Sequence, residues 1–274
     1  DQIGQYMERT YRDALDQYID LLAYHFGRSE NLPKKREYLL KAAEAAQAHY
    51  ANSAAINYYR QVLSLLPEEQ QVAIMLKLGQ VFELVGEWKE AEDIDRQAEN
   101  LSSQLNDLPR HARAQRALGW LLRKQGVYTG AEECLERARD SYRQLDDKAG
   151  VSHVLSNIGE IYRLQGKYDE ARRLYDESLS LAEQIAEPRD RQAARAHALK
   201  GAGTVATWQG DYVTARELNQ ESLTLRREFG DIPGVATLLN NLGIIARFQR
   251  DLIGARQMNE ESLRRRMSTG WSNA

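Results

Sequence analysis

The sequence of 274 residues contains one cysteine, Cys134, five prolines and no long apolar run. A single cysteine excludes an intrachain disulfide, which agrees with a reducing compartment. No stretch approaches the roughly 18 consecutive apolar residues that a membrane span requires, and no charged-then-apolar leader opens the chain. The sequence therefore predicts a soluble, cytoplasmic chain without membrane contact.

Neither sign of charge is in large excess, because 37 basic and 40 acidic residues give a formal net charge of -3. A protein dedicated to nucleic acid usually has a strongly basic domain, and the basic residues of this chain are scattered without a recognition helix. We therefore expect no direct contact with nucleic acid.

Sequence motifs of catalysis are absent as well. The chain has no GxxxxGK[ST], HExxH, CxxC or GxSxG, and the Gly-Ala-Gly at 201–203 lies in a helical pattern with no preceding strand. None of the five histidines has a partner four residues away, so no helical metal pair is predicted. We predict that the chain is not an enzyme and uses no cofactor or metal.

Repeated small residues are what the sequence does have. Glycines that serve as anchors recur 40, 40, 44 and 40 residues apart, at Gly79, Gly119, Gly159, Gly203 and Gly243. Twelve residues past each anchor stand Ala91, Ala131, Ala171, Ala215 and Ala255, and nineteen past it Ala98, Ala138, Ser178, Ser222 and Ser262. Seven past the first four are Gly86, Gly126, Gly166 and Gly210, which Arg250 replaces in the last copy. A fixed period of about 40 residues indicates a repeat architecture.

The register predicts two antiparallel helices in each copy, with small residues where the helices cross closely. A glycine inside a helix costs about 1 kcal/mol relative to alanine, so five anchors in register indicate a steric requirement. The second glycine falls in the turn, where a left-handed backbone is cheap. Nine residues past the anchor we expect a large side chain to cover the start of the second helix, at Trp88, Tyr128, Tyr168, Tyr212 and Leu252.

This pattern resembles the tetratricopeptide repeat in a long form of about 40 residues. An earlier, more divergent copy has Ala43 at the anchor position, followed by Ala55, Tyr59 and a closing Pro67. The resemblance implies an all-α, right-handed superhelical solenoid of antiparallel helix pairs. We expect a leading helix over 11–26 within residues 1–33, repeats at 34–67, 68–107, 108–147, 148–188, 189–230 and 231–268, and a truncated tail at 269–274, all in one continuous solenoid domain.

Three segments carry a narrower resemblance: LAYHFGRSENLPKKREYLLKAAEAA, ANSAAINYYRQVLSLLP and NQESLTLRREFGDIPGVATLLNNLGIIARFQRD. They resemble the repeat arrays that follow the nucleotide-hydrolysing module of bacterial multidomain signalling ATPases, among them transcription regulators and nucleotide cyclases. The resemblance implies a sensor that is part of a larger protein, with an attached ATPase and an output domain. The other hypothesis is a free-standing scaffold that docks a peptide or helix of a partner protein.

The candidate binding site is the concave groove, which the first helix of each pair lines in this fold. Inner-facing positions at offsets -6, -3, +1 and +4 from the anchor contain six Arg or Lys and two Glu. The guanidinium group of arginine binds carboxylates and phosphates through paired hydrogen bonds and stacks on planar groups. The asparagines of LLNNLG can form hydrogen bonds with a peptide backbone. We therefore predict a protein or peptide ligand, or a small anionic effector. The candidate residues are Arg113, Arg116, Trp120, Arg123, His153, Asn157, Arg163, His197, Lys200, Asn240, Asn241 and Arg247.

Two alternatives remain open at this point. The arginines would equally solubilise the inner wall by pairing with acidic residues of neighbouring helices. His153 and His197 share one offset in adjacent copies and are either a pH-sensitive pair or plain polar lining. We also expect the chain to be a fragment, beginning at Asp1, whose last helix is uncapped and self-associates through its apolar surface.

Overall fold

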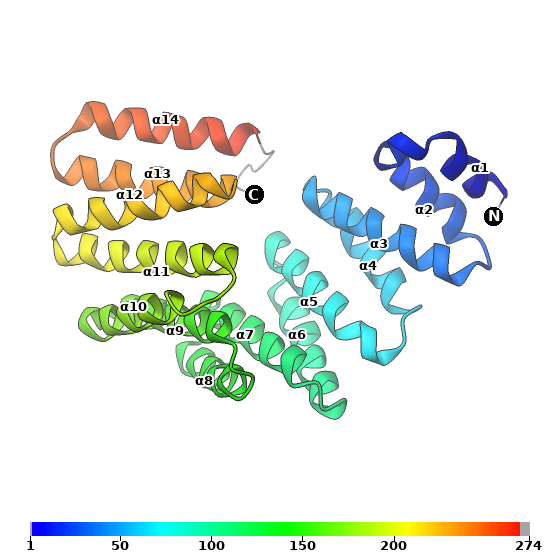
Figure 1. The fold of residues 1–274 in the computed structure, drawn as a ribbon, viewed down its shortest axis with the longest axis horizontal. Coiled ribbons are helices and arrows are strands. Elements are labelled where there is room, and N and C mark those ends of the chain that lie inside the picture. Colours follow the sequence, from blue (N-terminus) through cyan, green and yellow to red (C-terminus); the bar gives the residue numbers. More distant parts are fainter. Residues whose placement is uncertain (1, 269–274) are drawn as a thin grey trace. The chain divides into compact units, whose positions relative to one another are not determined.

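The computed structural model describes residues 2–268, and the regular elements of that range are all helices (Figure 1). The helices follow one another in consecutive pairs, which confirms the all-α expectation. The predicted tail at 269–274 lies outside the described residues. The chain divides into two compact units, Asp1–Leu121 and Leu122–Ala274, which are described separately below.

The first unit begins with short helices and continues with longer ones. Its elements are α1 (Gln2–Thr10), the 3-10 helix η1 (Arg12–Tyr18), α2 (Ile19–Gly27), α3 (Leu32–Ala48), α4 (Asn52–Leu63), α5 (Glu68–Val85), α6 (Trp88–Gln104) and most of α7 (Leu108–Lys124). From α2 to α6 each helix packs on the next. The core includes the stacked rings of Phe26 and Tyr38, whose centroids are 5.1 Å apart.

The single helix expected over residues 11–26 was wrong. The backbone leaves the helical region at Ala14, and η1 and α2 take the place of one helix. The rings of Tyr11 and Tyr18 pack with their centroids 4.3 Å apart. In a straight α-helix these residues would be separated by about 10 Å along the axis, so the ring contact requires the break.

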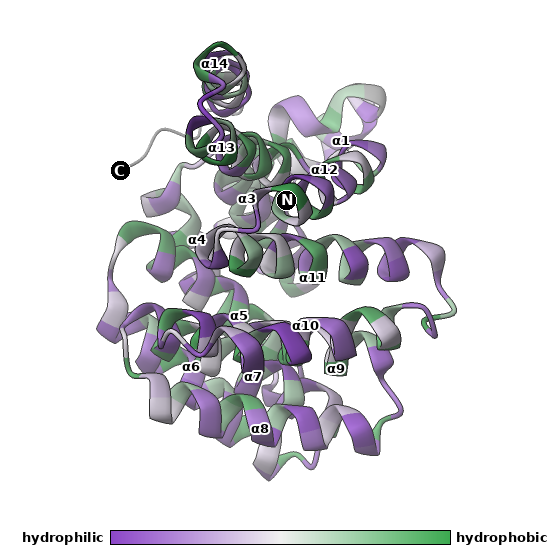
Figure 2. Ribbon diagram, turned by 90° about the vertical axis from the view of Figure 1, so that its left-hand side faces the viewer, coloured by the Kyte–Doolittle hydropathy of each residue, from purple (hydrophilic) through white to green (hydrophobic). Residues whose placement is uncertain are grey.

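The second unit consists of α8 (Tyr128–Gln144), α9 (Lys148–Leu164), α10 (Tyr168–Ala182), α11 (Pro188–Gln209), α12 (Tyr212–Glu228), α13 (Ile232–Phe248) and α14 (Leu252–Ser268). Each helix packs on the next one along the chain. The first helices of successive pairs also contact one another, α9 with α11 and α11 with α13. Hydrophobic and hydrophilic residues alternate in bands along helices such as α8, as amphipathic packing requires (Figure 2).

The anchor glycines have the steric role that their register predicts. A Cβ at Gly79 would overlap the carboxylate of Asp95, and a Cβ at Gly203 would overlap the amide of Asn219. In both cases the second helix of the pair places a side chain against the bare backbone of the first. The small residues nineteen past the anchor allow the same closeness, since the Ser222 hydroxyl donates to the carbonyl oxygen of Ala196 at 2.7 Å.

The turn glycines have the expected left-handed backbone. Gly86, Gly126, Gly166 and Gly210 have φ between 76° and 81°. Arg250, which replaces glycine in the last copy, also has a positive φ of 63°. The prediction for the position nine past the anchor was wrong in two copies, because Trp88 is 40% exposed and Leu252 is 70% exposed.

Helix α14 has several exposed apolar side chains, among them Ile253 and Met267, which are 75% and 73% exposed. Self-association through this helix stays a prediction. Within residues 2–268, none of the helices combines the length and the apolar composition that crossing a bilayer requires.

Candidate functional site

The candidate site lies in the second unit, on the side formed by the first helices of its pairs. We call this side the inner face, and define it by the residues of α9, α11 and α13 at the predicted inward offsets. His153 of α9 and His197 of α11 lie edge to face there, with ring centroids 5.5 Å apart. The equal offsets of these two histidines therefore do bring their side chains together.

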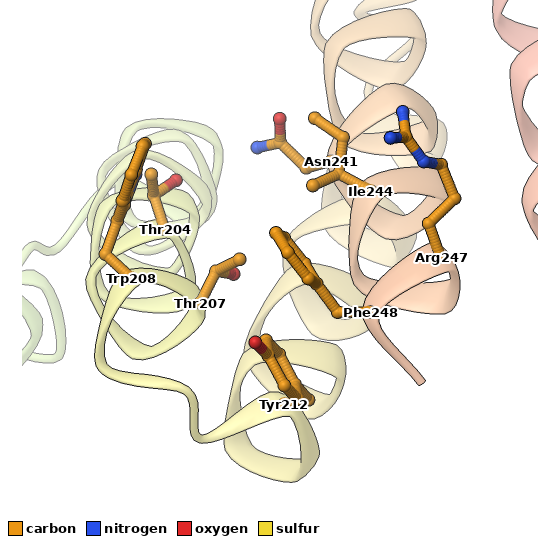
Figure 3. A pocket seen from close by; sticks show the side chains of 8 residues that line it. All are labelled: Thr204, Thr207, Trp208, Tyr212, Asn241, Ile244, Arg247 and Phe248. Carbon is orange, nitrogen blue, oxygen red and sulfur yellow. The ribbon is translucent and has the colours of Figure 1, made fainter. Parts of the chain in front are cut away.

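A pocket of about 650 Å³ opens on this face. Its lining residues are Thr204, Thr207, Trp208, Tyr212, Asn241, Ile244, Arg247 and Phe248. Figure 3 shows the side chains of α11 facing those of α13 across the pocket, with Tyr212 from the start of α12 at its base. The volume lies within the range of about 300–1,000 Å³ that ligand pockets usually have.

Three aromatic rings, those of Trp208, Tyr212 and Phe248, line the pocket. Trp208 is 63% exposed and Phe248 is 57% exposed. The Phe248 ring is stacked on Tyr212 with a centroid separation of 5.2 Å and an angle of 9° between the planes. Exposed aromatic side chains held by a neighbour offer a large contact area at a small cost in conformational entropy. This part of the pocket suits an apolar or planar group.

The polar groups of the pocket include the side chains of Asn241 and two threonines. The Asn241 amide nitrogen donates to the Asn219 side-chain oxygen over 3.4 Å, which orients the amide between α12 and α13. The hydroxyls of Thr204 and Thr207 donate to the carbonyl oxygens of Lys200 and Gly203, both at 2.8 Å. Their oxygens keep lone pairs that accept a donor, so the pocket combines apolar surface with a few fixed polar groups.

A second feature of the inner face is a set of cations around Glu160, which we call the Glu160 cluster: Arg123, Glu160, Arg163 and Lys200. Arg163 donates two hydrogen bonds to the two Glu160 carboxylate oxygens, at 2.8 and 2.7 Å. Arg123 approaches the same carboxylate at 3.9 Å. The side chains of Arg123 and Arg163 are only 10% and 14% exposed.

Two opposing effects act on the carboxyl of Glu160. Burial raises the pKa of this group, but the hydrogen bond from Arg163 and the charges of Arg163, Lys200 and Arg123 outweigh burial, so its pKa is lowered. Glu160 therefore stays ionised and compensates part of the positive charge. The alternative of pairing with an acidic residue of a neighbouring helix therefore holds for Arg123, whereas Arg163 pairs within its own helix, α9.

Lys200 differs from the two arginines. It is half-buried, and its ammonium forms no hydrogen bond or ion pair with any of the described residues. Burial lowers the pKa of Lys200, and the charges of Arg226, Arg123 and Arg163 lower it further, against the opposing effect of Glu160. A cation that is partly removed from water without a close counter-ion is costly, and a carboxylate or phosphate would relieve this cost.

The predicted site residues fall into two groups that belong to different units. Arg113, Arg116 and Trp120 lie in the first unit, where Arg113 is exposed and the Trp120 indole donates to Glu83 over 3.1 Å. In the second unit, Arg247 and Asn241 line the pocket and Asn240 is exposed beside it.

Asn157 does not belong to the inner face, which corrects its place in the predicted set. Its side chain is buried, with 4% of its surface exposed. Its neighbour Ser156 is also buried, and its hydroxyl forms a hydrogen bond of 2.9 Å with Ser178 of α10, away from the inner face. In α9 both side chains are therefore buried and not accessible to a ligand, although the same two offsets are occupied in α13 by the exposed Asn240 and by Asn241 of the pocket.

Sequence reasoning missed the aromatic residues of the pocket. Trp208 and Phe248 both stand five residues past an anchor, at Gly203 and Gly243, and this shared offset was the available signal. Offset +5 lies next to the inward offset +4, so it points to the edge of the inner face, where adjacent first helices approach.

The arrangement of consecutive helix pairs with an inner pocket defines a helical-repeat protein. The chain belongs to the tetratricopeptide repeat family, whose model matches residues 71–144, 121–184, 150–202 and 194–268. A curated relative, the Tonsoku-like protein of Danio rerio, is 28% identical over 124 residues, which are 45% of this chain and 8% of that protein. The chain thus spans less than a tenth of the length of this relative.

Two solved structures are similar to the chain over nearly its whole length. The apo form of RapI has a TM-score of 0.73 at 14% identity, covering 98% of this chain and 97% of RapI. NprR in complex with its cognate peptide NprX has a TM-score of 0.66 at 15% identity, covering 95% of this chain and 77% of NprR. At such identities the likeness shows a shared fold alone.

Proposed function

We propose that the chain is a binding module whose inner face holds an extended peptide segment of a partner protein. The observation that carries this proposal is the pocket between α11 and α13, with its exposed Trp208 and Phe248 and the oriented amide of Asn241. The aromatic rings would take an apolar side chain of the peptide. Asn241 would hold a backbone amide beside it, because a carboxamide matches the donor and acceptor of a peptide bond.

The shared fold supports this function. Helical-repeat proteins use the surface created by their stacked first helices to bind ligands. NprR, which is similar to this chain, forms a complex with its cognate peptide. Binding by an open pocket also agrees with the sequence, which lacks the common catalytic motifs.

The biological setting of this binding is proposed to be sensing. The resemblance of three segments to repeat arrays of bacterial signalling ATPases supports a role in which peptide binding regulates an attached ATPase and output domain. In that setting, adding the bound peptide to the parent protein would change its rate of ATP hydrolysis. A parent protein without a nucleotide-binding module would instead favour the free-standing scaffold.

Peptide binding is tested by selecting short random peptides, displayed with free carboxyl termini, against the immobilised chain. Enriched peptides are then synthesised and titrated calorimetrically. Trp208→Ala is expected to weaken their binding at least about tenfold, since central aromatic anchors dominate such interfaces. Trp88→Ala is the matched control, because it removes a partly exposed tryptophan of the first unit and is expected to leave the affinity unchanged.

The proposal fails if no peptide is enriched, or if the enriched peptides bind the Trp208→Ala variant as tightly as the wild type. Circular dichroism of the variant distinguishes loss of a contact from loss of the fold. Because Trp208 is 63% exposed, its removal is expected to leave the thermal unfolding midpoint nearly unchanged.

A further inference from the structure

Asn219 is a buried residue of α12 that contacts both helices of the pocket. Its side chain is 0% exposed, and it is not one of the residues that line the pocket. A Cβ at Gly203 of α11 would overlap its amide, and Asn241 of α13 donates to its Oδ1 over 3.4 Å. One side chain of the second helix is therefore held between the two first helices that face each other across the pocket (Figure 3).

The preceding copy shows that this contact belongs to the repeat. Tyr175 of α10 stands sixteen residues past its anchor, as Asn219 does, and is also buried. A Cβ at Gly201 would overlap the Tyr175 ring, and Gly201 stands two residues before the next anchor, as Asn241 does. Offset +16 of one pair therefore meets offset -2 of the next pair in both copies. Only the Asn219 copy has a carboxamide at both offsets of the sequence.

A backbone carbonyl fixes the orientation of both amides. The Ala215 carbonyl oxygen lies 2.7 Å from the Asn219 amide, and because a carbonyl only accepts, the nitrogen of Asn219 faces it. The oxygen of Asn219 then faces α13, where it accepts from the nitrogen of Asn241. The Asn241 oxygen accepts no hydrogen bond from the described residues, so it is available to a ligand of the pocket.

We propose that Asn219 is the positioning residue of the pocket, which holds the Asn241 amide so that its oxygen accepts a backbone N–H of the bound peptide. This inference rests on the proposed function, and it adds a residue outside the pocket lining that sets what Asn241 recognises. The last torsion of an asparagine side chain has a broad, roughly two-fold profile. Without Asn219, the Asn241 amide has no partner to orient it and must be ordered when the ligand binds.

The experiment uses the enriched peptides that depend on Trp208. Each peptide is made unchanged, with its apolar residue replaced by Ala, and as a series in which one backbone amide near the apolar residue is replaced by an ester. An ester lacks the N–H donor of the amide and keeps every side chain. All forms are titrated calorimetrically, so that the loss of one donor is measured separately from the loss of the apolar contact.

The chain itself indicates which variants to use. Asn219→Leu removes the carboxamide, and the fold accepts leucine at this offset, because Leu135 occupies it in an earlier copy with 0% of its surface exposed. Asn219→Ala is a second variant that adds no bulk, and Asn241→Ala removes the accepting oxygen. Asn259→Leu is the matched control, because Asn259 has the same offset in the last copy but is exposed on α14. Circular dichroism checks that each variant is folded.

We expect one ester position to weaken binding to the wild type and to Asn259→Leu by about threefold to tenfold, as the loss of one hydrogen bond does. With Asn241→Ala and with both Asn219 variants, the same ester is expected to alter the affinity less than about twofold. The unchanged peptide is expected to bind both Asn219 variants about threefold to tenfold more weakly than the wild type. Adding Asn219→Leu to Asn241→Ala is expected to cause no further loss, because Asn219 acts through Asn241. The apolar-to-Ala change is expected to weaken binding equally for all of these proteins.

Three results would overturn the inference while the proposed function stands. One is that folded Asn219 variants bind the peptides that depend on Trp208 as tightly as the wild type does. Another is that no ester weakens binding to the wild type, or that an ester weakens binding to the wild type and the Asn219 variants alike. The third is that Asn219→Leu weakens binding as much in the Asn241→Ala background as in the wild type, which would assign Asn219 to packing alone. Absence of any peptide that depends on Trp208 removes the proposed function and the inference together.

Discussion

Asp95 is a buried acid whose replacement by Asn is expected to stabilise the chain at neutral and alkaline pH. It lies in α6 against the backbone of Gly79, is 5% exposed, and its Oδ1 has no hydrogen-bond partner among the described residues. Burial, together with the negative charge of Glu83, raises the pKa of Asp95 from 3.8 to about 7. The folded chain therefore binds this proton more tightly than the unfolded chain.

The sign and size of the effect follow from proton linkage. Stability falls as the pH rises from about 4 to about 7, because in this range the unfolded chain has released the proton that the folded chain retains. A shift of about three pKa units corresponds to a cost of about 4 kcal/mol at pH 8 and about 2 kcal/mol at pH 5. Removing the charge relieves this cost.

Asn is the substitution that the chain itself indicates. Asn219 occupies the same offset from its anchor, Gly203, and its amide donates to the Ala215 carbonyl oxygen at 2.7 Å. An amide at position 95 could donate to the carbonyl oxygen of Ala91, which stands four residues earlier as Ala215 does before Asn219. Asp95→Asn is therefore expected to raise the free energy of unfolding by about 2 kcal/mol more at pH 8 than at pH 5.

The assay is urea unfolding followed by circular dichroism at pH 5 and pH 8, for the wild type, Asp95→Asn and the control Asp93→Asn. Asp93 is exposed on the same helix, so its replacement removes the same formal charge without relieving burial. A gain for Asp95→Asn that is equal at the two pH values, or a loss of stability at pH 8, would refute the reasoning.

Two further predictions concern the backbone. Gly201→Ala is expected to destabilise the chain by about 1–3 kcal/mol, because the added Cβ overlaps the Tyr175 ring. A Cβ at position 159 would lie 3.1 Å from the same ring, so the free energy of unfolding of Gly159→Ala is expected to stay within about 1 kcal/mol of the wild-type value. Equal midpoints of urea unfolding for the two variants would contradict this difference. Arg250→Gly is expected to stabilise by about 1 kcal/mol, since Arg250 has a φ of 63°; a lower thermal midpoint would contradict that expectation.

The packing positions of the fold were predictable from the sequence. The alanines twelve past each anchor are all nearly inaccessible, from 0% at Ala91 to 3% at Ala255. Such positions repeat because each copy meets the same steric limit where two helices cross. The left-handed turn at Gly210 was predictable for the same reason, since one backbone conformation recurs at each of these turns.

The binding site was only partly predictable. Arg247 and Asn241 were correctly placed on the inner face, but periodicity did not indicate that Arg163 is already bound by Glu160. That ion pair joins residues three apart, and whether they meet depends on rotamers and neighbours that a repeat pattern does not specify. The burial of Asn157 could not be predicted from its offset, because Asn241 has the same offset from its anchor and lines the pocket.

The inner offsets are the positions where copies differ without a cost in packing. At offset +1 the chain has Glu160, Thr204 and Ile244 in three successive first helices, whereas the alanine offset never varies. Residues that pack against a neighbouring copy are constrained by the shape of that copy, but residues of the inner face are constrained mainly by the ligand. At this one offset the face is therefore charged in α9, polar in α11 and apolar in α13.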